Sequence, residues 1–361
     1  MSITFSQSTA LKGLAILTIV MHNVIHMLSP VQENEFGFSF NRVATFLTAL
    51  PHSPLESLFS FYGWLGVPVF IFISGYGLTV KYGDGKFNPY HWLSRHYLRF
   101  ILLMLPCYAL YIAFVHRIDP LRPIDFHQVV NQQLLLLNLS DPEAIDPGVY
   151  WYLGLALQLY AWFLLLRRLP SRWVVGITAV CWAMTAFSPD AMVTWLRYNS
   201  PGWMTEFSAG ILLGRYQGNE ATFRACHDKF KYFHTPSGTE GDTSHSCNCF
   251  IKLSTQWLYV PGCLALIFLC SLSPYTFTLS GLLFVLLLLP YRHIFTRARA
   301  LLYLGSISAA LYVIHPVVRR VIIVCLRRFD IDLYPTLAAV AVLIISVIGA
   351  HIYTRILHRI W

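Results

Sequence analysis

The chain has 361 residues, of which 56% are hydrophobic and only 12% are charged. Soluble globular domains carry about a quarter charged residues, so this composition excludes an ordinary soluble protein. The formal net charge of +9 does not indicate nucleic-acid binding, because no soluble basic domain is present to bind it. Long apolar runs and a mean hydropathy of +0.55 instead predict an all-α, polytopic integral membrane protein.

Apolar runs of roughly membrane-spanning length follow one another along the whole chain. We predict a single membrane domain, residues 1–361, with about ten transmembrane helices. Two of the connections are long: residues 116–148 form an outer loop, and residues 217–255 form a polar cytoplasmic loop. The predicted spans are residues 10–29, 58–80, 93–115, 149–166, 172–188, 201–216, 256–272, 275–291, 301–318 and 336–354.

The basic residues are distributed unevenly between these spans. If the N-terminus is cytoplasmic, most of the 26 basic residues fall in inward-facing segments, which predicts that both termini face inward. One segment departs from this rule, because Arg319, Arg320, Arg327 and Arg328 fall on the outer side. They could form an interfacial amphipathic helix, bind an anionic group, or indicate that the spans are miscounted by one.

The first span carries three ionisable residues, Lys12, His22 and His26. At about 1.5 Å per residue, His22 lies about 15 Å beyond Lys12 and His26 about 21 Å beyond it, on one helix face. Ionisable side chains within hydrocarbon are functional by default, and histidine is the usual proton-transfer group. We therefore predict a catalytic role for these three residues. The alternative is a pair of histidines that hydrogen-bond between helices.

The second span and the segment after it offer candidates for binding a donor. The span ends in Ser74-Gly-Tyr76, where small residues allow a helix or a ligand to approach the backbone closely. Arg95 and Arg99 follow at a four-residue spacing, which suits phosphate groups. The positive-inside rule alone would also place basic residues here.

Polar and aromatic residues recur in the later spans. Trp151, Tyr152 and Trp203 could belong to the aromatic interface belt and pack between helices, or stack on sugars. Glu206 could belong to a functional site or be a solvated carboxylate at a helix end. His315 lies about 21 Å into the predicted span 301–318, where it could complete a polar centre or cap a kink before Pro316.

The cytoplasmic loop contains Cys and His residues, which zinc accepts as ligands. Their spacing is irregular, so we expect no metal site and favour a flexible polar loop. The residues concerned are Cys226, His227, His234, His245, Cys247 and Cys249.

Several of these motifs, in this order, resemble the integral-membrane acyltransferase-3 family, which includes bacterial O-acetylases of O-antigen, peptidoglycan and Nod factor. Two departures stand out. The family more often has Arg at the position of Lys12 and ten intervening residues before the histidine, a spacing that would end at Asn23. Gln158 stands where related sequences often carry Glu. The motifs are Lys12 with His22, Phe70–Tyr76, Arg95 and Arg99 with Pro106, Val149–Gly154 with Tyr160, Glu206–Gly214, Leu304–Ser308 and Leu311–Pro316.

The resemblance implies a membrane-bound O-acyltransferase of the bacterial inner (plasma) membrane. It would transfer an acyl group, usually acetyl from acetyl-CoA, from the cytoplasm to a hydroxyl of a cell-surface carbohydrate or glycolipid. The expected partners are acyl-CoA, this acceptor and membrane lipid, but no nucleic acid, and assembly as a homo-oligomer stays open. A transporter or flippase of a lipid-linked sugar, without acyl transfer, is the alternative function.

The resemblance also implies roles for individual residues. His22 would be the base, with Lys12 and His26 beside it as further catalytic residues. Arg95 and Arg99 would hold the CoA phosphates, and Ser74, Tyr76 or the Gly75 N–H would stabilise the oxyanion. Trp151, Tyr160 and His315 would contact the substrates.

Overall fold

The computed structural model describes residues 2–83, 85–118, 125–231, 247–331 and 333–360; for residues 116, 118, 218–231, 247–257, 358 and 360 it describes the backbone alone. Every element within these ranges is helical, as the composition predicts. The α-helices are α1 (Phe5–Leu28), α2 (Phe40–Ala49), α3 (Pro54–Tyr62), α4 (Gly66–Tyr82), α5 (Pro89–Ile118), α6 (Phe126–Gln133), α7 (Leu137–Ser140), α8 (Trp151–Leu166), α9 (Ser171–Phe187), α10 (Asp190–Tyr198), α11 (Met204–Lys231), α12 (Cys247–Ser271), α13 (Leu279–Leu288), α14 (Arg292–Phe295), α15 (Arg299–Ser306), α16 (Ser308–Arg328) and α17 (Pro335–Ile360). Short 3-10 helices are η1 (Gly63–Leu65), η2 (Pro142–Ala144), η3 (Gly148–Tyr150), η4 (Ser200–Trp203) and η5 (Leu289–Tyr291).

Six helices of the described chain are long and apolar enough to cross a membrane, or seven if a bent pair forms one span. The prediction of about ten spans and of inward-facing termini is not confirmed by this count. The apolar segments α9 and Leu258–Ser271 are shorter. The six are α1, Pro54–Tyr82, Pro89–Val115, Gly148–Leu166, α16 and α17.

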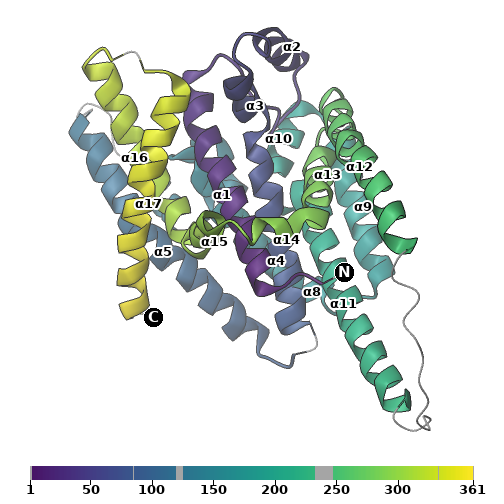
Figure 1. Ribbon diagram of the computed structural model, residues 1–361. Coiled ribbons are helices and arrows are strands. Elements are labelled where there is room, and N and C mark those ends of the chain that lie inside the picture. Colours follow the sequence, from purple (N-terminus) through teal and green to yellow (C-terminus); the bar gives the residue numbers. More distant parts are fainter. Residues whose placement is uncertain (1, 84, 119–124, 232–246, 332, 361) are drawn as a thin grey trace.

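Helix α1 runs through the middle of the bundle and packs against α3, α4, α15, α16 and α17 (Figure 1). Its start is set by a capping box, in which the Thr4 side chain accepts from the Gln7 N–H and the Gln7 side chain accepts from the Thr4 N–H. Its close crossing with α15 depends on two glycines, because a Cβ on Gly13 would lie 1.9 Å from the Leu301 carbonyl oxygen. A Cβ on Gly305 would lie 1.8 Å from a backbone oxygen of α1. The helix that carries the candidate site is therefore tightly held along its length.

The region 301–318 is not the straight span that the sequence predicts. The chain bends by 114° between Leu279–Phe295 and Arg299–Ser306, and a new helix, α16, starts at Ser308. His315 therefore lies seven residues into its helix, about 10 Å from the start rather than 21 Å. The four arginines of the outlying segment belong to α16 itself, with Arg319 and Arg320 in its interior.

The predicted loops are also partly helical. Helix α11 continues to Lys231 and α12 begins at Cys247, so both extend into the predicted polar loop 217–255. The Cys and His side chains of that loop, from Cys226 to Cys249, lie outside the described side chains. The predicted outer loop 116–148 contains α6, α7 and η2. In both places polar sequence extends a helix or forms short helices instead of an open connection.

Candidate active site

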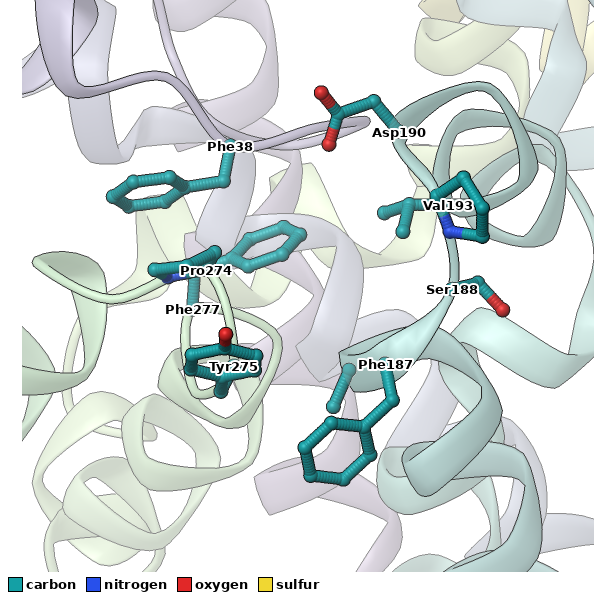
Figure 2. A pocket seen from close by; sticks show the side chains of 10 residues that line it. Phe38, Phe187, Ser188, Asp190, Val193, Pro274, Tyr275 and Phe277 are labelled. Carbon is teal, nitrogen blue, oxygen red and sulfur yellow. The ribbon is translucent and has the colours of Figure 1, made fainter.

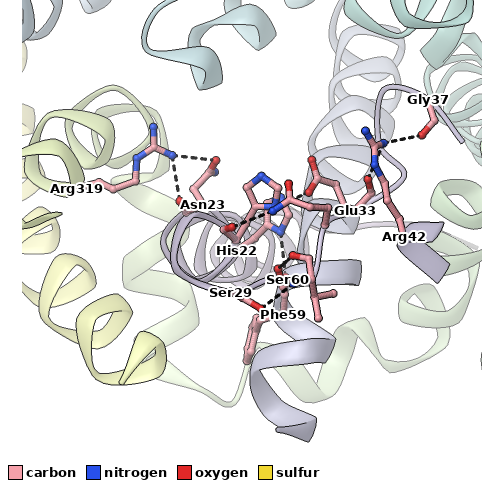
Figure 3. Close-up of polar contacts among 12 residues, drawn as sticks. His22, Asn23, Ser29, Glu33, Gly37, Arg42, Phe59, Ser60 and Arg319 are labelled. Carbon is pink, nitrogen blue, oxygen red and sulfur yellow. Dashed lines mark hydrogen bonds and ion pairs between the residues drawn. The ribbon is translucent and has the colours of Figure 1, made fainter. Parts of the chain in front are cut away.

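His22 is held in one protonation form by its neighbour on α3. The side chain is buried, 5% exposed, and its Nδ1 lies 3.0 Å from the Phe59 carbonyl oxygen (Figure 3). A carbonyl oxygen only accepts, so Nδ1 carries the proton of the neutral ring. The lone pair is then on Nε2, the nitrogen that a general base needs.

A glycine allows this histidine to fit. A Cβ placed on Gly63 would lie 2.6 Å from the His22 Cβ, closer than real side chains approach. The start of η1 can therefore lie against His22 only because residue 63 has no side chain. Gly63, in the second predicted span, thus leaves space for the His22 side chain.

Glu33 lies against the two histidines, although it comes from the loop after α1. A Glu33 carboxylate oxygen is 2.5 Å from the His26 Nδ1, and the ring centroids of His22 and His26 are 5.3 Å apart. Burial alone would raise the pKa of Glu33, but the hydrogen bond with His26 and the charges of His22 and His26 lower it to about 2. The carboxylate is therefore ionised at neutral pH, and it can stabilise a positive charge that forms on either ring.

The loop that carries Glu33 is fixed by backbone contacts. Arg42 Nη1 donates to the carbonyl oxygens of Glu33 and Gly37, both at 3.1 Å (Figure 3). The Ser60 hydroxyl donates to the Val31 carbonyl oxygen at 2.5 Å. These contacts keep the carboxylate next to the histidines without using its own oxygens.

Arg319 reaches the same part of α1 from α16. Its Nη1 lies 3.1 Å from the Asn23 carbonyl oxygen and 3.4 Å from the Asn23 Oδ1 (Figure 3). Asn23 in turn donates to the Ile19 carbonyl oxygen at 2.8 Å. Asn23, where the family's usual spacing would place the histidine, therefore serves as a contact between α1 and α16.

His22, His26 and Glu33 could also bind a metal ion, since each offers one ligand atom and these atoms lie within 4.8 Å of one another. Two histidines and a carboxylate are a donor set that zinc accepts. The His26–Glu33 separation of 2.5 Å is, however, shorter than the roughly 3.3 Å between two ligands of a tetrahedral zinc with bonds of about 2.0 Å. The observed distances fit a hydrogen-bonded pair better than a shared cation.

The other candidates on α1 and α4 lie away from His22. Lys12 is ten residues earlier on α1, about 15 Å away. Tyr76 is thirteen residues beyond Gly63, about 19 Å along α4, and its hydroxyl bonds to the backbone of Ile3 at 3.0 Å and to the Gln217 side chain. Ser74 is only two residues before Tyr76. The structure therefore does not bring Lys12, Ser74 or Tyr76 next to His22.

Arg95 and Arg99 line a separate cavity of about 350 Å³ beside α5. The Arg95 guanidinium lies 2.8 Å from the His91 Nε2. Tyr160 packs behind the cavity, with its ring 5.8 Å from Trp92 and 5.2 Å from His96. Basic groups and aromatic rings thus share one wall, a combination that suits a nucleotide phosphate ligand. The lining residues are Lys81, Tyr82, Phe87, Asn88, His91, Trp92, Arg95, His96 and Arg99.

Trp151 and His315 are buried in the core. The Trp151 ring stacks on Trp203 with centroids 5.4 Å apart. His315 is fully buried, its Nδ1 lies 3.1 Å from the Leu311 carbonyl oxygen, and its Nε2 has no partner among the described residues. Trp151 therefore packs between helices rather than in an open cavity. In His315 the Nδ1 is engaged, and the Nε2 keeps a free lone pair.

Glu33 and Arg319 were missed as site residues, although each left a signal in the sequence. Glu33 follows Pro30, which ends the helix of the two histidines, so the chain can fold back over them. Arg319 belongs to the segment that violates the positive-inside rule. A basic residue in such a position is explained when another part of the same protein accepts its hydrogen bonds.

The acyltransferase-3 family model, described as an acyltransferase domain, matches residues 6–355. No curated protein and no solved structure matches the chain. The match covers nearly the whole sequence, including both histidines of α1, the basic cavity and α16. Together with the long apolar helices, it identifies an integral membrane acyltransferase domain. The chain belongs to the acyltransferase-3 family.

Proposed function

We propose that the protein transfers an acyl group, in the usual case acetyl, from acyl-CoA to a hydroxyl of a cell-surface carbohydrate or glycolipid. The observation that carries this proposal is the His22 ring, which lies in an apolar helix, keeps its Nε2 lone pair and has the Glu33 carboxylate nearby. This is the arrangement of a general base with a counter-charge. The bacterial inner membrane is the location that fits these substrates.

The reaction needs one proton acceptor. His22 Nε2 takes the proton of the acceptor hydroxyl while the hydroxyl oxygen forms a bond to the thioester carbonyl carbon. The carbon–sulfur bond then breaks, and the thiolate of CoA receives this proton back from the His22 imidazolium, which regenerates the base. Glu33 stabilises the transient imidazolium on His22 because its negative charge lies within 4.8 Å of the ring nitrogen. No metal is needed for these steps, so the site is proposed to work with acyl-CoA as its only co-substrate.

The basic cavity is proposed to hold the nucleotide end of the donor. Lys81, Arg95 and Arg99 would bind its phosphates, with the adenine ring against Trp92. Gly63 touches His22, and Lys81 is eighteen residues further, about 27 Å along η1 and α4 if the path is helical. In this proposal the phosphates stay in the cavity while the pantetheine arm extends the thioester toward His22.

The test is acyl-CoA turnover by the purified full-length protein in detergent, with radiolabelled acetyl-CoA and polysaccharide from the envelope of the source cells. The expected result is label transfer to the polysaccharide, together with a rate in His22→Ala at least 100-fold lower. His293→Ala is the matched control, because His293 is an exposed histidine away from the site. Full label transfer by His22→Ala would contradict the mechanism. Movement of a lipid-linked sugar across vesicles without consumption of acetyl-CoA would support a flippase instead.

A further inference from the structure

A second cavity, of about 470 Å³, lies between the turn joining α9 to α10 and the turn joining α12 to α13 (Figure 2). It is at the end of the bundle where α2, α3 and α10 lie (Figure 1). Its wall combines four aromatic rings with a carboxylate and a hydroxyl. The lining residues are Phe38, Ala186, Phe187, Ser188, Pro189, Asp190, Val193, Pro274, Tyr275 and Phe277.

Two of the four rings of this cavity are largely exposed, whereas Phe277 is buried. Phe187 is 68% exposed and Tyr275 is 54% exposed, and their centroids lie 5.5 Å apart. Phe38 and Phe277 form a second pair, 6.1 Å apart. Exposed aromatic surface is unfavourable in water, so a ligand that covers these rings gains free energy. Apolar walls with a few polar groups are the usual composition of a ligand pocket.

The polar groups of the cavity wall indicate which class of ligand fits the cavity. The Asp190 carboxylate stands above the space between Phe38 and Val193 (Figure 2), and it can only accept hydrogen bonds. A sugar ring matches both the aromatic rings and the carboxylate of the cavity. Its C–H face packs on an aromatic ring, and its hydroxyls donate to a carboxylate. A purely hydrocarbon ligand would leave the carboxylate without a partner.

The cavity is linked to the catalytic histidines by a short stretch of chain. Phe38 follows Glu33 by five residues, so their Cα atoms lie at most about 18 Å apart. Between them, Gly37 lies beside α10, since a Cβ placed on Gly37 would be 3.5 Å from the Thr194 Oγ1. The loop Glu33–Phe38 therefore contacts His26 at one end and lines the cavity at the other.

Polar groups with unused hydrogen-bonding capacity lie behind Phe277. Arg197 is fully buried, its guanidinium is 6.0 Å from the Phe277 ring, and it donates to the carbonyl oxygens of Glu35 at 2.7 Å and Gly202 at 2.6 Å. Its Nη2 and the buried Glu206 Oε1 have no partner among the described residues. Neither Arg197 nor Glu206 is among the residues that line the cavity, so Arg197 supports the Phe277 ring from the protein side.

We propose that this cavity binds a sugar unit of the acceptor, adjacent to the unit whose hydroxyl is acylated at His22. The proposal rests on the proposed function and adds to it the place where the acceptor is recognised. It assumes an acceptor of more than one sugar unit, with one unit at His22 and another in the cavity. Phe187 and Tyr275 supply the stacking surface, and Asp190 accepts from the sugar hydroxyls.

The test is the KM for lipid-free polysaccharide from the source envelope, measured with purified full-length protein and saturating acetyl-CoA by the release of free CoA thiol. Tyr275→Ala, Phe187→Ala and Asp190→Ala are each expected to raise this KM about tenfold, without a change in the KM for acetyl-CoA. Tyr275→Phe keeps the ring and is expected to keep the wild-type KM. A single-sugar fragment of the polysaccharide is expected to show a high KM that the three variants leave unchanged.

The control is Tyr334→Ala, which removes an equally exposed ring, 75% exposed, outside the cavity. It should change neither KM. If the wild type turns over acetyl-CoA and the three variants keep its KM for polysaccharide, the cavity proposal is overturned while the proposed function stands. A cavity occupied by membrane lipid gives this result, because the polysaccharide probe is lipid-free. If the wild type fails to acylate the polysaccharide at all, it is the proposed function that fails.

Discussion

His26 and Glu33 are joined at the C-terminal end of α1, with 2.5 Å between Nδ1 and the carboxylate oxygen. The pair forms because the chain reverses after Leu28 and lays the loop back against the helix. It brings a negative charge next to His22 although the apolar helix itself contains no acidic residue. The same carboxylate therefore serves both rings.

The first prediction concerns catalysis by the Glu33 charge. Two unit charges 4.8 Å apart interact by about 3 kcal/mol at an effective dielectric constant of 20. Glu33→Gln removes this stabilisation of the imidazolium and is expected to lower kcat about 100-fold, with little change in the KM for acyl-CoA. The matched control is Glu143→Gln, since Glu143 is an exposed carboxylate on η2. Equal rates for both variants would exclude a role for Glu33 in the reaction.

The second prediction concerns stability in acid. The pKa of Glu33 falls from 4.5 to about 2 on folding, so its ionised form favours the folded state above pH 4.5. This contribution, about 3 kcal/mol, is lost as the pH falls from 4.5 toward 2. Thermal unfolding in detergent should show a smaller loss of Tm over this range for Glu33→Gln than for the wild type. Parallel Tm curves for the two proteins would contradict the assignment of the pair.

The third prediction uses two glycines of the second span. Gly63→Ala places a methyl group 2.6 Å from the His22 Cβ, whereas a Cβ at Gly77 meets nothing within 4 Å. Gly63→Ala is expected to destabilise the protein by about 1–3 kcal/mol and to reduce acyl transfer strongly, because His22 must shift. Gly77→Ala should leave both Tm and activity near the wild type. The comparison requires only unfolding curves and the label-transfer assay.

The fourth prediction concerns the contact between α16 and α1. Arg319→Ala removes two hydrogen bonds from a charged donor to Asn23, and such bonds contribute about 1.5–3 kcal/mol each. We expect a lower Tm and reduced activity. Arg327→Ala, an exposed arginine of the same helix, is the control and should behave like the wild type. An unchanged Tm in Arg319→Ala would show that α16 is held by its apolar contacts alone.

The fifth prediction concerns the donor cavity. Arg95→Gln and Arg99→Gln each remove a positive charge from its wall and are expected to raise the KM for acyl-CoA about fivefold. Added salt should weaken donor binding in the wild type more than in the double variant, because screening acts on charges that are still present. Arg168→Gln, an exposed arginine after α8, should leave the KM unchanged. A donor KM insensitive to both substitutions and salt would place the donor elsewhere.

The helical fold and the place of His22 within a long apolar helix could be predicted from single residues and apolar length, because both are local properties of the sequence. The Glu33 contact could not, since it depends on how a loop of eleven residues folds back after α1. The break at Ile307 was missed for a different reason. Residues 301–318 are apolar on both sides of it, so hydropathy shows no boundary between α15 and α16.

Arg319 illustrates a third limit. Its position is anomalous under the positive-inside rule, and the sequence leaves three explanations open. The structure favours a further explanation, a contact within the protein, because the Arg319 guanidinium lies within hydrogen-bonding distance of the Asn23 carbonyl oxygen on α1. Pairing of residues 296 positions apart follows from helix packing, which the order of spans alone does not determine.

The hydrogen bond from His22 to the Phe59 carbonyl has one further consequence under the proposed reaction. With one ring nitrogen permanently engaged, the other has to both collect the proton and hand it back to the departing sulfur. Hydroxyl and thioester must then converge on the same edge of the imidazole, from opposite sides of the bilayer. Direct transfer within a ternary complex satisfies this requirement, and initial-rate plots against either substrate would then intersect rather than run parallel.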